Sequence, residues 1–113
     1  MISKELAGAS TRAIILSILH RADSYGYAII QQVRDLSGGS LEWKEGMLYP
    51  VLHRLEDEGL IESFWHAPAG ERRRKYYRLL PAGAKALDVE KSNWLSVDAM
   101  LAGLWGLEPR ISL

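Results

Sequence analysis

The spacing of the apolar residues changes at Gly59 from the period of a helix to that of a strand, and that change restricts the fold more than any other feature. Before Gly59 the apolar residues recur every three or four positions, which is the spacing of helices with one buried face. Beyond it, two short runs alternate between two faces, and Pro68 and Gly70 lie between the runs, which predicts a β-hairpin. Ile61, Ser63 and Trp65 are expected to share one face, as are Lys75, Tyr77 and Leu79.

Three helices are expected before the hairpin and one after it. The first ends at residues 22–24, and the second runs from about Tyr25 to Leu36 and stops at the Ser-Gly-Gly sequence of residues 37–39. A brief extended piece is expected at residues 41–44. The last and longest helix runs from Pro81 to about Leu107. The residues expected to be buried by the first two helices are Ile14, Ile15, Ile18, Leu19, Ile29, Ile30, Val33 and Leu36.

Pro50 restricts where the third helix begins. Leu48, Leu52 and Leu55 recur at helical spacing, but proline has no amide hydrogen and its ring clashes with the preceding turn. Proline is tolerated near a helix start, where amides lack intrahelical partners. The third helix is therefore expected to begin only a few residues before Pro50 and to present its first turn outward.

Three helices followed by a hairpin is the order of a winged helix-turn-helix domain, whose third helix enters the DNA major groove. We therefore expect a mainly α fold with a small β-hairpin. Residues 1–80 are expected to form the DNA-binding domain, with the N-terminal helix also contributing to a dimer interface. Residues 81–113 are expected to form a C-terminal dimerisation helix.

The predicted DNA contacts come from the third helix and the hairpin. In the third helix, the side chains opposite the buried apolar stripe could reach phosphates or base edges of DNA. The alternative is that these side chains form an ordinary solvated helix face. Net charge is zero, with 14 basic and 14 acidic residues, so any positive surface must be local. Four consecutive cations are expected at the hairpin tip, beside DNA phosphates. The predicted contacts are Met47, Tyr49, Pro50, His53 and Arg54 in the helix and Arg72, Arg73, Arg74 and Lys75 in the hairpin.

The last helix carries an apolar pattern with a seven-residue period. Leu87, Trp94 and Leu101 form one row, and a neighbouring row, interrupted by Glu90, continues with Val97 and Leu104. Such a pattern favours packing against a partner helix. A chain of 113 residues makes only a modest core, which also favours association with a second copy. The alternative is that this helix, including Trp94 and Trp105, packs on the first helix of its own domain.

Several function classes are not supported by the sequence. Cysteine is absent, and His20, His53 and His66 are scattered without metal-ligand spacing. The acidic residues 56–58 are consecutive and indicate a solvated face, and neither a phosphate-binding glycine loop nor a serine nucleophile elbow occurs. An N-terminal apolar run of about seven residues is too short for a secretory core or a membrane span. We expect a cytoplasmic, non-enzymatic protein without metal, cofactor or membrane partner.

The sequence resembles the PadR family of bacterial transcriptional regulators. The matching stretches are "SYGYAIIQQV", "LYPVLHRLEDEGLI" and "RRRKYYRLLPAGAKAL", and the resemblance covers nearly the whole chain. It implies a homodimer that binds a roughly palindromic double-stranded DNA operator, usually as a repressor released by a small molecule. With one helix after the hairpin, the chain looks like the subgroup with a short C-terminal region.

The chain is also similar to the multidrug-binding repressors of that subgroup. Their Trp-x-x-Val-Asp stretch matches Trp94, Val97 and Asp98, and their first helix matches residues 4–16. This similarity implies a pocket for planar aromatic effectors at the dimer centre. The implied pocket residues are Leu6, Ala9, Ala13, Trp94, Val97 and Asp98. A winged-helix protein-interaction module without DNA binding stays open as an alternative, and DNA affinity across a salt series would discriminate between the two.

Overall fold

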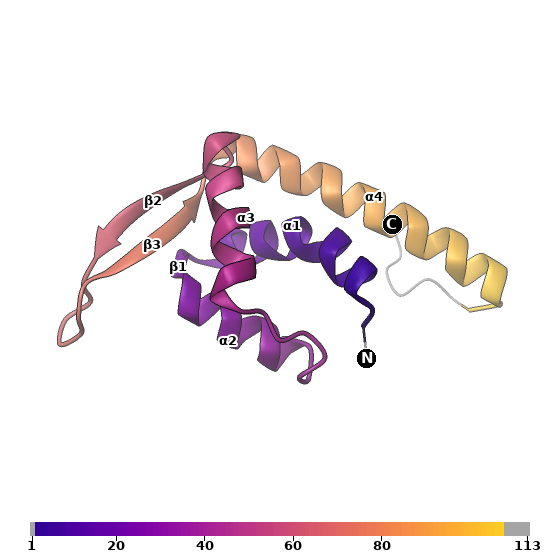
Figure 1. Ribbon diagram of the computed structural model, residues 1–113. Helices are drawn as coiled ribbons and strands as arrows, with labels where there is room; N and C mark the ends of the chain where they lie inside the picture. Colours follow the sequence, from indigo (N-terminus) through magenta and orange to yellow (C-terminus); the bar gives the residue numbers. More distant parts are fainter. Residues whose placement is uncertain (1, 108–113) are drawn as a thin grey trace.

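The computed structural model describes residues 2–107 of the protein, and within them the chain forms four helices and one three-stranded sheet (Figure 1). Residues 108–113 of the predicted dimerisation segment lie outside the described residues. The hairpin and the far end of the last helix extend from opposite sides of the helical body. The elements are α1 (Lys4–Arg21), β1 (Ser24–Tyr25), α2 (Gly26–Leu36), α3 (Glu45–Asp57), β2 (Ile61–His66), β3 (Arg74–Leu79) and α4 (Pro81–Trp105).

The hairpin has the two alternating strands that the sequence predicts, and the structure adds their register. Ser63 pairs with Tyr77 and Trp65 pairs with Lys75, so the two predicted faces coincide. A third strand, β1, was not predicted: Tyr25 pairs with Tyr76 instead of starting the second helix, which begins one residue later. A strand of two residues is too short to show alternation.

The buried core lies where the three N-terminal helices, the sheet and the first half of α4 meet. It includes most of the predicted apolar residues, and Ile14 and Ile30 are partly buried at its edge. Leu36 was predicted to be buried, but 66% of it is exposed, because α2 ends at this residue with its side chain outside the core. Tyr77 is fully buried, and this burial raises the pKa of its phenol to about 12.

Helix α3 begins five residues before Pro50, as the proline predicted. The backbone of Lys44 is extended, and its carbonyl accepts hydrogen bonds from the amides of Met47 and Leu48, both at 3.0 Å. Pro50 is exposed, so its ring lies on the solvent side of the helix. The segment before α3 is irregular rather than a strand, although Leu41 and Trp43 are buried and tie it to the core.

Helix α4 packs on the buried core through its first half, and most side chains of its second half are exposed, although Ala102 is buried there. Leu87 belongs to the buried core, and Glu90 forms an ion pair with Arg12 of α1 at 3.4 Å. The expectation that Leu87 belongs to a dimer interface is therefore wrong, because its own domain covers it. Beyond this contact the helix projects past α1 (Figure 1).

Candidate nucleic-acid interface and ligand pocket

The outward face of α3 carries most of the predicted contact residues. Leu48, Leu52 and Leu55 are buried, so the opposite side of the helix faces solvent. Met47, Pro50, His53 and Arg54 are exposed on that side. Two of them, His53 and Arg54, carry nitrogen donors that can reach phosphate or base oxygens. This face has the polar chemistry that DNA contact needs.

Tyr49 lies differently from the other predicted contacts of α3. It is half-buried, and its hydroxyl end lies against Gly26 at the start of α2. A Cβ atom on residue 26 would overlap the Tyr49 ring and hydroxyl, so glycine is needed for this close approach. Tyr49 therefore holds α3 against α2, and only part of its side chain is open to solvent.

The four hairpin cations do not all lie at the tip. Arg72 and Arg73 lie in the connection before β3 and are exposed, whereas Arg74 and Lys75 are within β3, half-buried and on opposite faces. The prediction of four cations at the tip is therefore wrong for Arg74 and Lys75. Alternation along a strand sends neighbouring side chains to opposite faces.

Aromatic rings hold three of these cations in place. The guanidinium carbon of Arg73 lies 4.7 Å from the centre of the Trp65 ring, and that of Arg74 lies 4.6 Å from Tyr25. The ammonium of Lys75 lies 5.8 Å from the Tyr77 ring. Such contacts each contribute about 0.5–1 kcal/mol at exposed sites and restrict the motion of the charged group. The positive charges of the hairpin are therefore partly preorganised.

The outer face of the sheet is lined by aromatic residues from all three strands. Tyr76 of β3 lies at its centre, with ring-centre distances of 5.1 Å to Tyr25, 5.8 Å to Phe64 and 5.1 Å to His66. Arg78 covers Phe64, with its guanidinium carbon 3.9 Å from the ring centre. These contacts join β1, β2 and β3, and so they stiffen the base of the hairpin.

The acidic residues at the end of α3 are tethered rather than solvated as a group. Glu56 accepts a hydrogen bond from the Ser63 hydroxyl at 2.9 Å, and Glu58 pairs with Arg12 at 2.8 Å. The prediction of a solvated acidic face is therefore wrong for Glu56, which is half-buried, whereas Glu58 is exposed although it is paired. Since Arg12 also contacts Glu90, one guanidinium connects α1, α3 and α4 and helps fix the orientation of α3.

A pocket of about 550 Å³ lies between α1 and α4, and two of the predicted effector residues, Ala13 and Trp94, line it. The remaining lining is mostly apolar and includes Ile14, Ile18 and Leu36. Leu36 is the residue whose burial was predicted wrongly, so its exposed side chain borders this pocket. The other predicted effector residues are exposed and do not line it; these are Leu6, Ala9, Val97 and Asp98.

Within residues 2–107, no group of three or more His, Asp or Glu side chains could hold a metal ion. In the same part of the chain, no helix is both long and apolar enough to cross a membrane.

Comparison with known proteins gives a consistent result. Residues 15–89 match the transcriptional regulator PadR-like family. The chain is 38% identical over 79 residues to a transcriptional regulator of Mycobacterium tuberculosis, covering 70% of this chain and 73% of the relative. It is also similar to the crystal structure of a PadR family transcription regulator from Clostridium difficile, with 34% identity, a TM-score of 0.75, and coverage of 85% of this chain and 98% of the other.

A second solved structure extends the similarity. A transcriptional regulator from Clostridium thermocellum has a TM-score of 0.81 and 32% identity, with coverage of 91% of this chain and 97% of that one. The similarity therefore includes the helical body, the sheet and most of α4.

Proposed function

This chain belongs to the PadR-like family of transcriptional regulators, and we propose that it is a cytoplasmic repressor that binds a palindromic operator as a homodimer. Its family and its relatives are transcriptional regulators rather than enzymes, in agreement with the sequence. The observation that carries the DNA-binding proposal is the exposed face of α3 beside a cationic hairpin.

The hairpin would contact the DNA backbone and α3 would read the major groove. Arg72 and Arg73 are exposed and would neutralise phosphates directly, whereas Arg74 and Lys75 are half-buried and would contribute less. Each phosphate contact contributes about 0.9 to the slope of log affinity against log salt concentration. The hairpin should therefore supply affinity that does not depend on sequence.

A DNA titration across a salt series tests this proposal. Replacing Arg72 and Arg73 together by alanine should reduce the slope by about 1.8, from two lost phosphate contacts. The matched control replaces Arg34 and Lys85, two exposed cations outside the hairpin, and should leave the slope unchanged. If the parent protein shows no salt-dependent DNA affinity, the protein-interaction alternative is favoured and the repressor proposal fails.

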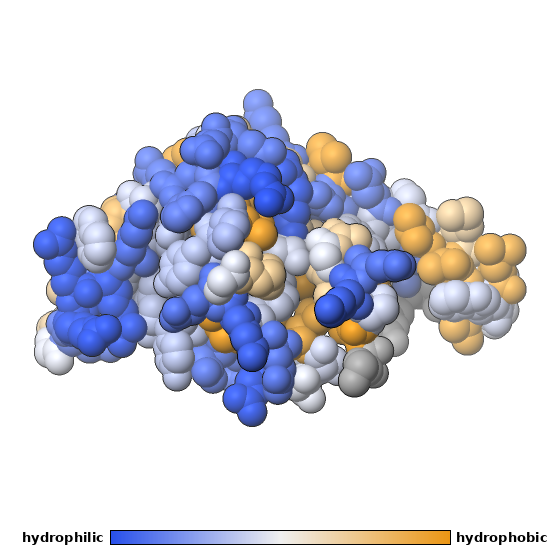
Figure 2. Space-filling model, viewed as in Figure 1, coloured by the Kyte–Doolittle hydropathy of each residue, from blue (hydrophilic) through white to orange (hydrophobic). Residues whose placement is uncertain are grey.

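The dimer proposal rests on the exposed second half of α4. Figure 2 shows a hydrophobic region at the end of the molecule where this helix projects. Contiguous exposed apolar surface of this kind marks an interaction site. A second copy would supply the cover and place a second α3 about one helical turn of DNA, ~34 Å, away. The exposed apolar residues here are Val97, Met100, Leu104, Trp105 and Leu107.

Operator spacing tests the proposed symmetry. Inserting about five base pairs between the half-sites turns one of them to the opposite side of the DNA, because about ten base pairs make one turn. Tight binding should then be lost, while a ten-base-pair insertion should restore part of it. Undiminished affinity after the five-base-pair insertion would contradict the two-fold arrangement.

We further propose that planar aromatic effectors bind near Trp94 and release the repressor from DNA. Ala13 and Trp94 lie together in an apolar pocket, and a second protomer would extend it with the exposed Val97 and Asp98. Stacking on the indole would hold a flat ring, and Asp98 would favour cationic rings.

Dye binding to two tryptophan variants tests the effector proposal. Trp94→Ala should weaken binding of a planar cationic dye by roughly tenfold, since stacking and cation–π contacts are each worth about 0.5–2 kcal/mol. Trp65→Ala, which removes an exposed indole from the hairpin, is the matched control and should retain the dye. Equal dye affinity in the folded Trp94→Ala dimer would show that the indole is ordinary packing.

A further inference from the structure

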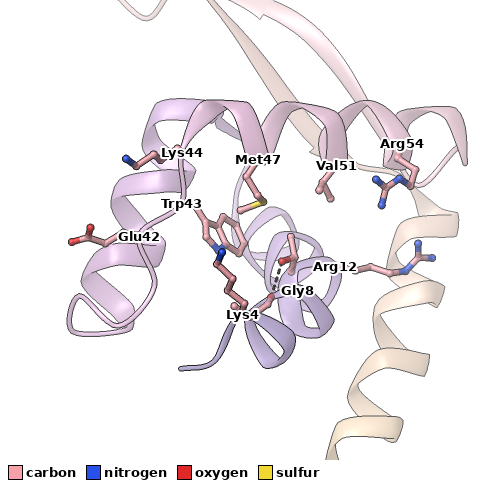
Figure 3. Close-up of a pocket in the computed structure, with 11 residues that line it drawn as sticks. Lys4, Gly8, Arg12, Glu42, Trp43, Lys44, Met47, Val51 and Arg54 are labelled. Carbon is pink, nitrogen blue, oxygen red and sulfur yellow. Dashed lines mark hydrogen bonds between the residues drawn. The ribbon is translucent and has the colours of Figure 1, made fainter. Parts of the chain in front are cut away.

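The flank of α3 that faces α1 carries a row of four side chains at helical spacing. The row consists of Lys44, Met47, Val51 and Arg54, separated by three, four and three residues. All four line a groove of about 640 Å³ between α3 and the N-terminal half of α1. Figure 3 shows them in sequence order along α3, with Lys44 at one end and Arg54 at the other. The row therefore places two apolar side chains between two cations.

Met47, in the first turn of α3, is backed by a buried aromatic ring. Trp43 is only 6% exposed and lines the same groove, and in Figure 3 its indole lies next to the Met47 side chain. Met47 itself stays 36% exposed, so its thioether rests on the indole and still meets solvent. Val51, one turn further along, is partly buried against the core. The apolar centre of the row is therefore held in place at the surface of the helix.

The cations at the two ends of the row are free to pair with phosphates. Among the described residues, no carboxylate, including Glu42 of the same groove, lies within ion-pair distance of Lys44 or Arg54. The α1 side leaves space, since a Cβ atom on Gly8 would meet nothing within 4 Å. A helical row from residue 44 to residue 54 spans about 15 Å. The DNA major groove is about 12 Å wide, so the row can reach across it with a cation at each wall.

We propose that Met47 reads the 5-methyl group of a thymine in each operator half-site, with Val51 beside it excluding water. In the major groove the base edges present hydrogen-bonding groups and one apolar group, the thymine methyl. A thioether and an isopropyl group carry no strong donor, so they distinguish bases through that methyl. Lys44 and Arg54 would position the row on phosphates without specifying sequence. This inference rests on the proposed function and adds the base feature that α3 recognises.

Replacing thymine by deoxyuridine in the DNA tests the inference, because this change removes only the methyl group. Duplexes selected from random DNA by the parent protein supply the operator, and each thymine is then replaced singly. At one thymine of each half-site the replacement should weaken binding by about fourfold, which corresponds to about 0.8 kcal/mol for one buried methyl-sized group. Replacement in the flanking DNA should have no effect. Selected half-sites without thymine, or no effect at any thymine, would overturn the inference.

Three variants of α3 show whether Met47 makes the contact. Met47→Ala should bind the thymine and deoxyuridine operators equally, whereas Met47→Leu should retain a preference for thymine. His53→Ala is the matched control, because His53 is exposed on the same helix outside the groove lining. It should weaken binding to both operators and keep the fourfold ratio. Circular dichroism checks that all three variants are folded. A fourfold ratio that survives in folded Met47→Ala would overturn the inference.

A salt series tests the position of the row across the major groove. Lys44→Gln and Arg54→Gln should each lower the slope of log affinity against log salt concentration by about 0.9 and should keep the preference for thymine. Lys85→Gln, at an exposed cation of α4, should leave the slope unchanged. An unchanged slope in both α3 variants would overturn the arrangement across the groove.

The outcomes separate this inference from the proposed function. If the parent protein selects no duplex, the DNA-binding proposal fails and the inference fails with it. If the parent binds DNA with the salt dependence expected of the hairpin but does not respond to deoxyuridine, only the reading of thymine by Met47 is overturned.

Discussion

The two halves of α4 have similar apolar sequences and opposite surroundings. Leu87, in the first half, is 2% exposed and belongs to the core of its own domain, whereas Leu104, in the second half, is 75% exposed. Both leucines belong to the same predicted interface pattern. The difference shows that a seven-residue period identifies a helix face that needs cover without identifying what covers it.

The two glycines of the helix show the same contrast. At Gly83 a Cβ atom would overlap the carbonyl oxygen of Leu60 in the connection between α3 and β2, so the backbones are in contact. At Gly103 a Cβ atom would meet nothing within 4 Å. The first half is therefore packed to the limit of backbone approach at Gly83, and the second half has open space at Gly103 in a single protomer.

The largest effect, on dimerisation, is expected from a charged residue introduced into the second half of α4. Leu104→Asp should dissociate the proposed dimer while the domain stays folded, because an unpaired carboxylate in an interface costs about 3–5 kcal/mol. Sedimentation and circular dichroism measure the two properties separately. Val89→Asp, at an exposed apolar position in the first half, should remain dimeric. If Leu104→Asp also remains dimeric, the second half of α4 is not the interface.

A smaller effect, on the free energy of unfolding, is expected from a substitution in the first half of α4. Leu87→Ala should lower the free energy of unfolding by about 2–5 kcal/mol, through lost burial and a residual cavity. Urea unfolding in the Leu104→Asp background measures this effect on a single protomer. Val89→Ala is the exposed control and should change stability by less than about 0.5 kcal/mol. A similarly small change for Leu87→Ala would contradict the contrast between the two halves.

Replacing each of the two glycines by alanine should change the stability of the protomer in opposite directions. Gly83→Ala should destabilise the protomer by about 1–3 kcal/mol or more, because the new methyl group overlaps a backbone carbonyl that cannot easily move. Gly103→Ala should stabilise it by up to about 1 kcal/mol, the helix propensity gained where space is open. Both are compared in the Leu104→Asp background by thermal unfolding. Destabilisation by both substitutions would show that the second half is already packed within one protomer.

The smallest effect is expected at the boundary between the halves. Glu90→Gln removes one of the two ion pairs of Arg12 and leaves the shorter pair with Glu58 intact. The free energy of unfolding should fall by no more than about 1 kcal/mol, and the decrease should be smaller in high salt, as expected for partly exposed ion pairs. Asp88→Asn, an exposed neighbour without an ion pair among the described residues, is the control. A decrease in stability that does not depend on salt would indicate that Glu90 stabilises the protomer through packing rather than through its charge.

Local patterns predicted the parts of the fold that depend on neighbours in the chain. Alternation predicted which residues of β2 and β3 share a face, and Pro50 predicted an early start for α3. Both follow from backbone geometry within a few residues. The exposed positions of Pro50, His53 and Arg54 follow from the same helical period.

The same patterns could not predict contacts between distant segments. Tyr49 is held against Gly26, and Glu58 is paired with Arg12 of α1. In β3, Arg74 lies over Tyr25, a residue of a strand that the sequence did not predict. Each of these side chains is separated from its partner by more than twenty residues, so no short window of sequence contains both.

The sequence by itself determined the order of the four helices and the hairpin, the faces of the hairpin strands, the start of α3 and the family to which the chain belongs. Only the tertiary structure decided which apolar residues of α4 are covered, which hairpin cations are stacked and which side chains line each pocket. The physical reason is the distance along the chain over which each kind of interaction acts. Helix and strand periods arise from bonds between near neighbours, whereas burial and charge pairing depend on the packing of elements that are far apart in the chain.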